Sequence, residues 1–500
     1  MKIFSAAQMR EWDACTLKEE PITSLALMER AATACVHWIQ ERDYGNATFH
    51  VFCGKGNNGG DGLAIARLLL EKGKMVHVYI LETGQKGTPD FQANLHRLHA
   101  LTFEIHFIQS EHFFPQLRKD AVVVDALLGT GLQRPLEGTA ALLAQHINQA
   151  GATVIAVDIP SGMYADQTCR LLPKIHATHT LTFQAWKLCF LMEENQEAFG
   201  EVHLLPIGLH RGYEPVTPVT ARMIDVALIR SLKKRRSPFA HKGHFGHALL
   251  VGGSYGKIGA MVLSSRACLQ SGAGLVTAAI PTCGYTVLQA AVPETMVQSD
   301  TSTTHISQVP RELWRFQAVG IGPGMGLHEE TGKALLQLLK ELHLPVVLDA
   351  DALNLLSMVQ NARDFLPPES ILTPHPKEFE RLFGAVTDNF DRLERARSKA
   401  SEWNCFILLK THHTLIACPD GQLWFNNTGN SGMAKAGSGD VLTGFLTGLL
   451  AQGYRPEHAC ILGVYLHGLA GDLAAEKQGE EAMLASDTIQ MLGPAFREIR

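Results

Sequence analysis

Several features that would place a protein in a special class are missing from this sequence. Its 500 residues contain no run of about 18 apolar residues, so no membrane-spanning helix is expected. The N-terminus lacks an apolar core of signal-peptide length, and none of the 10 cysteines forms a C-x-x-C pair, which favours reduced thiols over a disulfide framework or a zinc site. A net charge of -5 gives no general electrostatic case for nucleic acid. We therefore expect a cytoplasmic protein that binds neither membranes nor nucleic acid.

What the sequence does contain is an alternation of short apolar runs with helical stretches. Up to residue 205, runs such as "FHVFC" and "TVIAVDIP" alternate with helical segments, and a second series begins beyond residue 243. This alternation predicts α/β domains with mostly parallel sheets covered by helices on both faces. The segment 209–222 has two prolines within four residues and interrupts the pattern. We expect one domain in 1–213, a second in 223–500, and a linker at 209–222.

A basic run, "KKRR", occupies residues 233–236 just after this segment. It has two interpretations, a patch for nucleic acid or a solvated connector. Four charges without aromatic neighbours are weak support for the first, so the connector is favoured.

The most distinctive loop of the first half is "CGKGNNGGDG", residues 53–62, between an apolar run and a predicted helix. Its Gly54-x-Gly56-x-x-Gly59 spacing is typical of dinucleotide-binding loops, because glycines let the backbone approach a phosphate at a helix N-terminus. Glu82 ends the next strand, about where an acid that binds ribose is found. No Gly-Lys-Ser/Thr follows, so this is not a Walker A loop. A glycine turn needed only for packing is the alternative.

Polar side chains also follow three predicted strands of this half. Asn58, Asp125 and Ser161 each come at a strand end, and in an open α/β sheet these ends share one rim. Amide, carboxylate and hydroxyl oxygens suit a hard cation. Each residue taken alone is better explained as a cap or turn, but the coincidence of three favours a site.

The second half carries a different glycine turn, Gly437-Ser-Gly439-Asp440, at the start of a helix. Successive backbone N–H groups there can hold a transferring phosphoryl group, and Asp440 can take a hydroxyl proton. A simple helix cap is the alternative. Asp349 and Asp351 end one predicted strand, and Lys410 ends another, where it suits nucleotide phosphates.

His375 stands between two prolines in "TPHPKEF". It is either a buried structural histidine or a metal ligand together with His412 and His413. No regular ligand spacing supports the metal, and the prolines favour a rigid loop that faces a pocket.

The motifs "GKGNNGGDGLAIARLL", "DALLGTGLQRPLEG" and "DIPSG" resemble the N-terminal, Rossmann-like domain of the NAD(P)H-hydrate epimerases. The resemblance implies that the dinucleotide is a substrate, hydrated NADH or NADPH (NADHX or NADPHX), and that Asp158 is a plausible acid/base. It implies potassium (K⁺) ligands at Asn58, Asp125 and Ser161. The substrate contacts it implies are Asn57, Asn58, Gly59, Gly60, Asp61, Gly129, Thr130, Gly131, Leu132, Gln133, Arg134, Pro135 and Asp158. Met163-Tyr164 replaces the Leu-Asp pair usual in that family.

The second half resembles the ribokinase-like, ADP-dependent NAD(P)H-hydrate dehydratases through "GPGMG", "DADALN", "TPHPKEFERLFG" and "AGSGD". The implied reaction phosphorylates the hydrate with ADP and releases AMP and phosphate, with Asp440 as base and Mg²⁺ offsetting phosphate charge. The implied hydrate contacts are Ala260, Gly324, His375 and Asp440, and the nucleotide contacts are Lys410, Thr411, His412, His413, Thr414 and Gly439. Thr411, Lys377 and Ser438 depart from the family's usual residues, which bears on nucleotide preference.

The sequence therefore predicts a bifunctional repair enzyme, an epimerase followed by a dehydratase, with small-molecule substrates and a homo-oligomeric state. An NAD-dependent dehydrogenase domain fused to a vitamin-type kinase is the alternative. A further alternative is that the first half is only a nucleotide-binding scaffold or interaction module, without catalytic activity.

Overall fold

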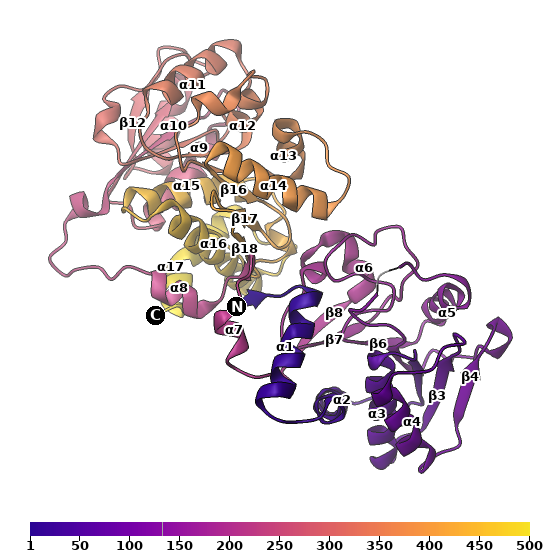
Figure 1. The fold of residues 1–500 in the computed structure, drawn as a ribbon. Helices are drawn as coiled ribbons and strands as arrows, with labels where there is room; N and C mark the ends of the chain where they lie inside the picture. The colour runs from indigo at the N-terminus through magenta and orange to yellow at the C-terminus, as the bar shows by residue number, and fades with distance from the viewer. Residues whose placement is uncertain (133) are drawn as a thin grey trace. The chain divides into compact units, whose positions relative to one another are not determined.

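The computed structural model describes residues 1–132 and 134–500, and these form two compact units. The N-terminal unit contains Lys2–Val219 with Asp388–Phe390, and the C-terminal unit contains Met1, Thr220–Thr387 and Asp391–Arg500. Each has its own mostly or wholly parallel sheet and its own helices, which confirms the predicted fold class (Figure 1). The short helix α7 (Tyr213–Val216) lies inside the segment predicted as a linker, and the limits at 213 and 223 stay a prediction.

The N-terminal unit contains a seven-stranded sheet in which every strand pairs in parallel, in the order β4-β3-β2-β5-β6-β7-β8. The order reverses between β2 and β5, and such a switch point is where α/β sheets bind ligands. The strands are β2 (Phe49–Cys53), β3 (Val76–Leu81), β4 (Ile105–Ile108), β5 (Val122–Ala126), β6 (Thr153–Val157), β7 (His179–Phe183) and β8 (Glu201–Leu205); the two-residue β1 (Lys2–Ile3) precedes them.

Helices cover both faces of this sheet, which explains why β2 is apolar at every position except His50. Val51 belongs to the core on one face, with the helices α2 and α3, and Phe52 to the core on the other face, with α5. All five residues of β2 are buried. The helices are α1 (Ala6–Glu19), α2 (Ser24–Gln40), α3 (Asn57–Glu71), α4 (Pro89–His99), α5 (Gly138–Gln149) and α6 (Gln196–Phe199).

The sheet of the C-terminal unit follows the order β9-β18-β17-β16-β15-β14-β13-β10-β11-β12. It is parallel from β12 through β16, whereas β17 pairs antiparallel with both β16 and β18. Its order reverses between β10 and β13. The strands are β9 (Ala221–Met223), β10 (His247–Val251), β11 (Leu275–Ile280), β12 (Met296–Ser299), β13 (Ala318–Ile321), β14 (Val346–Leu348), β15 (Ile371–Leu372), β16 (Phe406–Leu409), β17 (Leu415–Ala417) and β18 (Leu423–Phe425).

Its helices are α8 (Val226–Leu232), α9 (Ile258–Gln270), α10 (Tyr285–Ala291), α11 (Glu329–Glu341), α12 (Ala350–Ser357), α13 (Pro376–Phe383), α14 (Asn389–Trp403), α15 (Ser438–Ala451), α16 (Pro456–Gln478) and α17 (Ala485–Glu498). The glycine-rich α15 lies against α9, and a Cβ on Gly444 would come within 2.0 Å of the Ser264 carbonyl oxygen. Glycine there permits the close helix contact that buries α15. In either unit, no helix of the described residues is both long and apolar enough to span a membrane.

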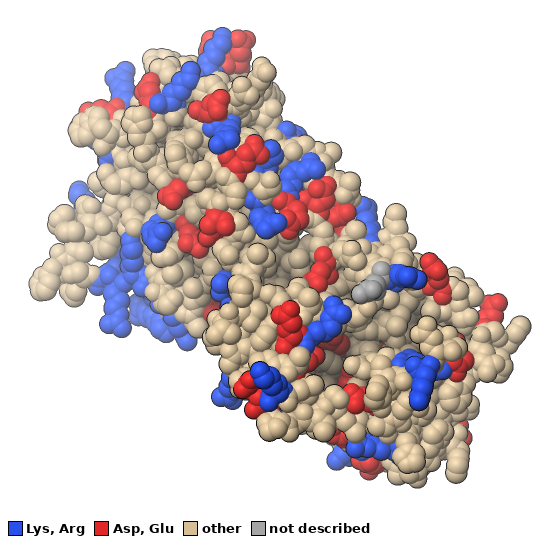
Figure 2. Space-filling model, viewed as in Figure 1, with Lys and Arg blue, Asp and Glu red and all other residues tan. Residues whose placement is uncertain are grey.

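The basic run 233–236 follows α8, and on the face drawn in Figure 2 a group of basic side chains gathers in this region. Its cations are used internally, because Lys233 Nζ donates to the Phe496 carbonyl at 3.2 Å and Lys234 Nζ to the Gly453 carbonyl at 2.6 Å. Arg236 donates to the Gly272 carbonyl. These bonds fit the connector interpretation, since the charges cap the ends of neighbouring helices.

Candidate active sites

The glycine loop joins β2 to α3, and its glycines serve different purposes. A Cβ on Gly54 would lie 1.9 Å from the Leu127 carbonyl oxygen, and one on Gly59 would lie 1.8 Å from the Gly54 carbonyl oxygen. A Cβ on Gly56 would meet nothing within 4 Å. Packing therefore requires Gly54 and Gly59, while Gly56, at the N-cap of α3, leaves room for a ligand beside the helix start.

Asp125 and Ser161, which the sequence placed at one rim, are in direct contact. Ser161 donates to the fully buried Asp125 carboxylate through its hydroxyl at 2.6 Å and its backbone N–H at 2.8 Å. The Leu127 N–H adds a third bond at 3.2 Å. Burial nevertheless raises the pKa of Asp125 to about 6, and these donors offset only part of that rise. A buried carboxylate of this kind can serve as a cation ligand, because a positive charge beside it favours its ionised form.

Asn58 belongs to the first turn of α3 and lies next to Gly129, where a Cβ would come 3.2 Å from Asn58 Cγ. Its amide nitrogen is buried without a hydrogen-bond partner. With the Asp125 carboxylate and the Ser161 hydroxyl, the Asn58 side chain supplies an all-oxygen donor set of low charge. These residues fit a hard cation.

Asp158 follows β6 with a φ of 65°, a left-handed conformation that is strained for most residues. Its Oδ1 accepts from Lys187 Nζ at 2.7 Å and from the Phe183 N–H at 3.2 Å. Lys187 is only 1% exposed and donates also to the Thr182 hydroxyl at 2.6 Å. A buried lysine thus holds the strand-end carboxylate in place. Our sequence reasoning missed Lys187, although a lysine four residues beyond the end of β7 was a usable signal.

Other carboxylates surround Asp158. Burial, and then the charges of Asp158 and Asp13, raise the pKa of Asp61 well above its usual value. Burial and the Asp158 charge raise the pKa of Asp13, on α1, to about 6, although Lys187 opposes the rise. Asp13 gave no sequence signal. The cluster can hold and pass a proton, because its acids are tuned toward neutral pH.

The other residues predicted for this rim stay predictions as substrate contacts. The segment 129–135 follows β5 as expected, but Gln133 lies outside the described residues, so nothing is added for it. Glu82 forms an ion pair with Lys55 of the glycine loop. Glu82 therefore lies beside the loop, where an acid that binds ribose would be expected.

In the C-terminal unit, Asp349 follows β14 and is fully buried. Its Oδ1 accepts from Lys410 Nζ at 2.6 Å, and its Oδ2 accepts from the Thr443 hydroxyl at 2.8 Å. Burial alone would raise the pKa of Asp349, but the Lys410 charge and the donated hydrogen bonds outweigh it and lower the pKa. This pair joins the ends of β14 and β16 to α15.

The turn at Gly437–Asp440 begins α15 beside this pair. Gly437 has a φ of 95°, and a Cβ on Gly439 would lie 3.3 Å from Asp349 Oδ2 and 3.4 Å from Lys410 Nζ. Burial and the Asp349 charge raise the pKa of Asp440 to about 6, while Lys410 lowers it. A carboxylate with this pKa, at a helix start, is suited to general-base chemistry near neutral pH.

The predicted hydrate contacts Gly324 and Ala260 lie together. A Cβ on Gly324, whose φ is 59°, would come 3.1 Å from the Ala260 Cβ. Asp351 accepts from the Gly326 N–H at 2.8 Å, and its charge helps to raise the pKa of Asp440. The loops after β10, β13 and β14 therefore meet at the switch point of this sheet.

His375 caps α13, since its Nδ1 accepts from the Lys377 N–H at 3.1 Å. The Glu378 carboxylate lies between His375 and Lys410, 3.2 Å from His375 Nε2 and 3.9 Å from Lys410 Nζ. Among the described residues, no metal-type cluster includes His375, which fits a positioned loop histidine rather than a metal ligand.

The predicted nucleotide contacts 410–414 form the turn between β16 and β17. Burial lowers the pKa of His413 to about 4, so this histidine is neutral. A residue absent from our predictions, His467 of α16, is buried near Lys410 with an unpartnered Nε2, and burial lowers its pKa to about 4.

Comparison with known proteins shows which protein families this chain resembles. Residues 248–493 match the family model described as NAD(P)H-hydrate dehydratase, and residues 24–189 match that described as YjeF-related protein N-terminus. A bifunctional NAD(P)H-hydrate repair enzyme of Moorella thermoacetica is 38% identical over 100% of this chain and 97% of its own length. One from Escherichia coli is 34% identical over 94% of this chain and 89% of its own length.

Among solved structures, a ribokinase-like superfamily protein from Enterococcus faecalis is 28% identical and covers 57% of this chain and 98% of its own, with a TM-score of 0.50. The two sheets, each with acidic groups at its switch point, are those of a two-domain α/β enzyme. The chain belongs to the family of bifunctional NAD(P)H-hydrate repair enzymes. This confirms the resemblance seen in the sequence and removes support from the dehydrogenase–kinase alternative.

Proposed function

We propose that the N-terminal unit epimerises the R and S forms of hydrated NADH and NADPH, and that the C-terminal unit dehydrates the S form with ADP. The proposal is supported most by one observation. Each unit presents, at a strand end or a helix start, an aspartate with a lysine close by, Asp158 with Lys187 and Asp440 near Lys410. Two complete sites in one chain suit two successive reactions on one substrate.

In the epimerase site, Asp158 is proposed as the acid/base at the hydrated ring. Lys187 keeps its carboxylate oriented, and Asp61 and Asp13 lie near enough for the Asp158 charge to raise their pKa values. Asn58, Asp125 and Ser161 would hold K⁺, whose low charge suits a set with one formal negative charge. A bound K⁺ would fix the rim of the dinucleotide site, where the segments 57–61 and 129–135 would contact the substrate.

In the dehydratase site, Asp440 takes the proton of the hydrate hydroxyl while the oxygen of that hydroxyl attacks the terminal phosphorus of ADP. The bond from that phosphorus to AMP breaks, and phosphate then leaves from the ring carbon while a ring proton is lost and the double bond returns. The backbone N–H groups of 437–440 stabilise the transferring group. Lys410–Thr414 and Gly439 contact the nucleotide.

Mg²⁺ would neutralise phosphate charge in this site. The negative charges of Asp349 and Asp351 both raise the pKa of Asp440. A divalent cation in this site would therefore offset the repulsion among the three carboxylates. The preference for ADP over ATP, the cytoplasmic location and a homo-oligomeric state remain predictions from the sequence.

The test separates the two sites with mixed R and S hydrates, ADP and K⁺. Asp158→Ala is expected to block epimerisation, so NADH recovery stops once the S form is consumed, while Asp120→Ala, an exposed control, recovers all NADH. Asp125→Ala is expected to lower the epimerase rate and its response to K⁺. Full recovery by Asp158→Ala would reject Asp158 as the acid/base, and equal rates with and without K⁺ in the unaltered protein would reject the K⁺ site.

A further inference from the structure

A second group of polar side chains lies at the opposite end of the N-terminal sheet from Asp158. His179 is the first residue of β7, and Glu201 is the first residue of the edge strand β8, directly beside it in the register. His203 lies two residues along β8 and therefore on the same face as Glu201. Asp158 and Ser161 follow the carboxyl end of β6, so this group is not part of the proposed epimerase site.

Three atoms of this group converge on one point. His179 Nδ1 lies 3.2 Å from His203 Nε2, and Glu201 Oε2 lies 3.4 Å from the first and 3.5 Å from the second. Bonds of about 2.0–2.2 Å from a four-coordinate zinc would set its ligand atoms about 3.3–3.6 Å apart. Two of the three separations fall within that range, and the third, at 3.2 Å, lies just below it.

The surroundings favour neutral imidazoles. Trp38 of α2 packs against both rings, with centroids 5.1 Å from His179 and 4.7 Å from His203. Burial lowers the pKa of each histidine although Glu201 opposes this. Arg42, stacked on Trp38, adds a positive charge nearby that also lowers the pKa of both histidines.

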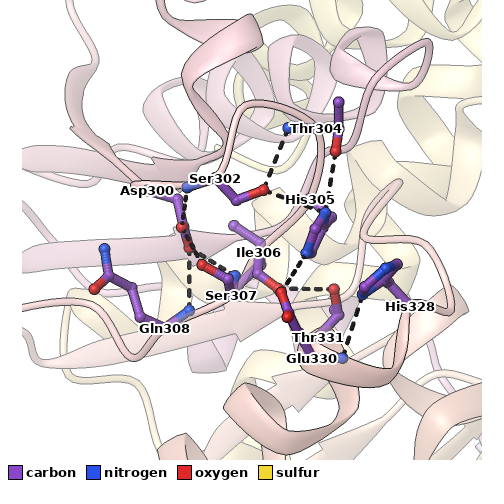
Figure 3. A network of polar contacts seen from close by, with 10 residues as sticks. All are labelled: Asp300, Ser302, Thr304, His305, Ile306, Ser307, Gln308, His328, Glu330 and Thr331. Atoms are coloured by element: carbon purple, nitrogen blue, oxygen red, sulfur yellow. Dashed lines mark hydrogen bonds and ion pairs between the residues drawn. The ribbon is translucent and has the colours of Figure 1, made fainter.

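Two other histidine–glutamate groups occur among the described residues, and neither is as well arranged. His305, His328 and Glu330 gather in the C-terminal unit (Figure 3). There, however, His328 Nδ1 accepts the Glu330 N–H, which leaves the proton on Nε2, and His305 bonds Glu330 directly. His77 lies on β3, His106 on its neighbour β4 and Glu104 just before β4, with side chains 36–57% exposed.

We propose that His179, Glu201 and His203 form a binding site for a divalent transition metal of the zinc class, with a fourth position open to water. Imidazole and carboxylate ligands suit zinc, and three protein ligands leave one place free. The ion would clamp the edge strand β8 to β7. It stabilises the N-terminal unit and takes no part in the chemistry at Asp158.

The test titrates the full-length, chelator-treated protein with Zn²⁺, with Co²⁺ as the spectroscopic probe. We expect one tightly bound ion per chain and a melting temperature of the N-terminal unit that rises with Zn²⁺ concentration. His179→Ala and His203→Ala should each weaken binding by more than about 100-fold, beyond the loss seen when an outer partner is removed. Because the Glu201 carboxylate is exposed, Glu201→Gln should not disturb folding. This variant should weaken Zn²⁺ binding and leave the epimerase rate unchanged.

The matched control is His77→Ala with His106→Ala, which removes two histidines from the exposed group on β3 and β4. It should leave the Zn²⁺ affinity and the stoichiometry unchanged. No binding by the unaltered protein, or binding lost in this control but kept in Glu201→Gln and His203→Ala, would overturn the proposal. The epimerase rate is measured in parallel with K⁺, so a failed metal site is distinguishable from a failed epimerase.

Discussion

The two units place a lysine beside different carboxylates. In the N-terminal unit Lys187 bonds Asp158, the residue proposed to act on the substrate, and the buried Asp125 is left to a hydroxyl and backbone donors. In the C-terminal unit Lys410 bonds Asp349, a buried supporting residue, and the proposed base Asp440 keeps a pKa raised to about 6. The comparison indicates that the lysine of one site bonds the proposed acid/base itself, whereas the lysine of the other bonds a supporting carboxylate beside the proposed base.

Backbone strain accompanies both arrangements. Asp158 has a φ of 65° directly after β6, and Ala350, which follows Asp349 and begins α12 two residues after β14, has a φ of 49°. A left-handed conformation costs an ordinary L-residue roughly 1–2 kcal/mol. Such strain tends to collect where a side chain must be aimed, and here it marks the strand end of each site.

The largest expected effect separates the two sites completely. Asp440→Asn keeps the size of the side chain and the start of α15, but the amide cannot accept the hydroxyl proton. Dehydration should fall by about 10²–10⁴ while the R and S hydrates still equilibrate. The exposed Asp364→Asn serves as the control. Loss of epimerisation in Asp440→Asn, with circular dichroism unchanged, would contradict the two-site model.

Removing the lysine of the C-terminal site should destabilise that unit in a pH-dependent way. The pKa of Asp349 is lowered when folded, so its charge stabilises the fold above the usual pKa near 3.8. In Lys410→Met this buried charge has lost its cation, at a cost of about 3–5 kcal/mol at pH 7. The deficit should shrink on acidification, because protonation removes the charge. Thermal melts at pH 7 and pH 5 measure it, and an equal deficit at both would contradict the pairing.

The raised pKa of Asp440 should be visible in the rate of dehydration. The reaction needs the carboxylate, which is lost as the pH falls through about 6. The rate constant kcat should therefore be level above that pH and fall about tenfold per unit below it. A profile level down to pH 5 would show that the group is not the base. The Asp364→Asn control should give the same curve as the unaltered protein.

The binding of K⁺ by the N-terminal unit should also weaken as the pH falls. A proton on Asp125, whose pKa is raised to about 6, competes with the cation. The K⁺ concentration for half-maximal epimerase activity should rise up to about tenfold per pH unit below 6 and stay constant above it. Titrations at pH 7.5 and pH 5 measure this. Identical midpoints would argue that Asp125 is not a ligand.

The smallest effect concerns the close approach at Gly439. A Cβ there would lie 3.3 Å from Asp349 Oδ2 and 3.4 Å from Lys410 Nζ, so these two groups would have to yield slightly. Gly439→Ala should raise KM for ADP several-fold, a loss of about 1 kcal/mol, and leave epimerisation unchanged. An unchanged KM would place the nucleotide elsewhere.

Much of the fold followed from local pattern. The largely apolar runs "FHVFC" and "HALLV" became β2 and β10, because strands buried on both faces need apolar residues at most positions. The glycine turns and the helix starts after them were equally local. Asn58, Asp125 and Ser161 were chosen as strand-end residues, and the structure brings Asp125 and Ser161 into contact; their role as ligands stays a prediction.

The sequence by itself determined the two α/β units, the family and the residues at the glycine turns, because periodicity, strand ends and loop motifs are written within short windows. Only the tertiary structure decided which lysine meets which carboxylate. Lys187 reaches Asp158 from 29 residues away, and Lys410 reaches Asp349 from 61. It also decided that His179 meets His203 across neighbouring strands. Such pairs depend on strand order and register, which no single stretch of chain encodes.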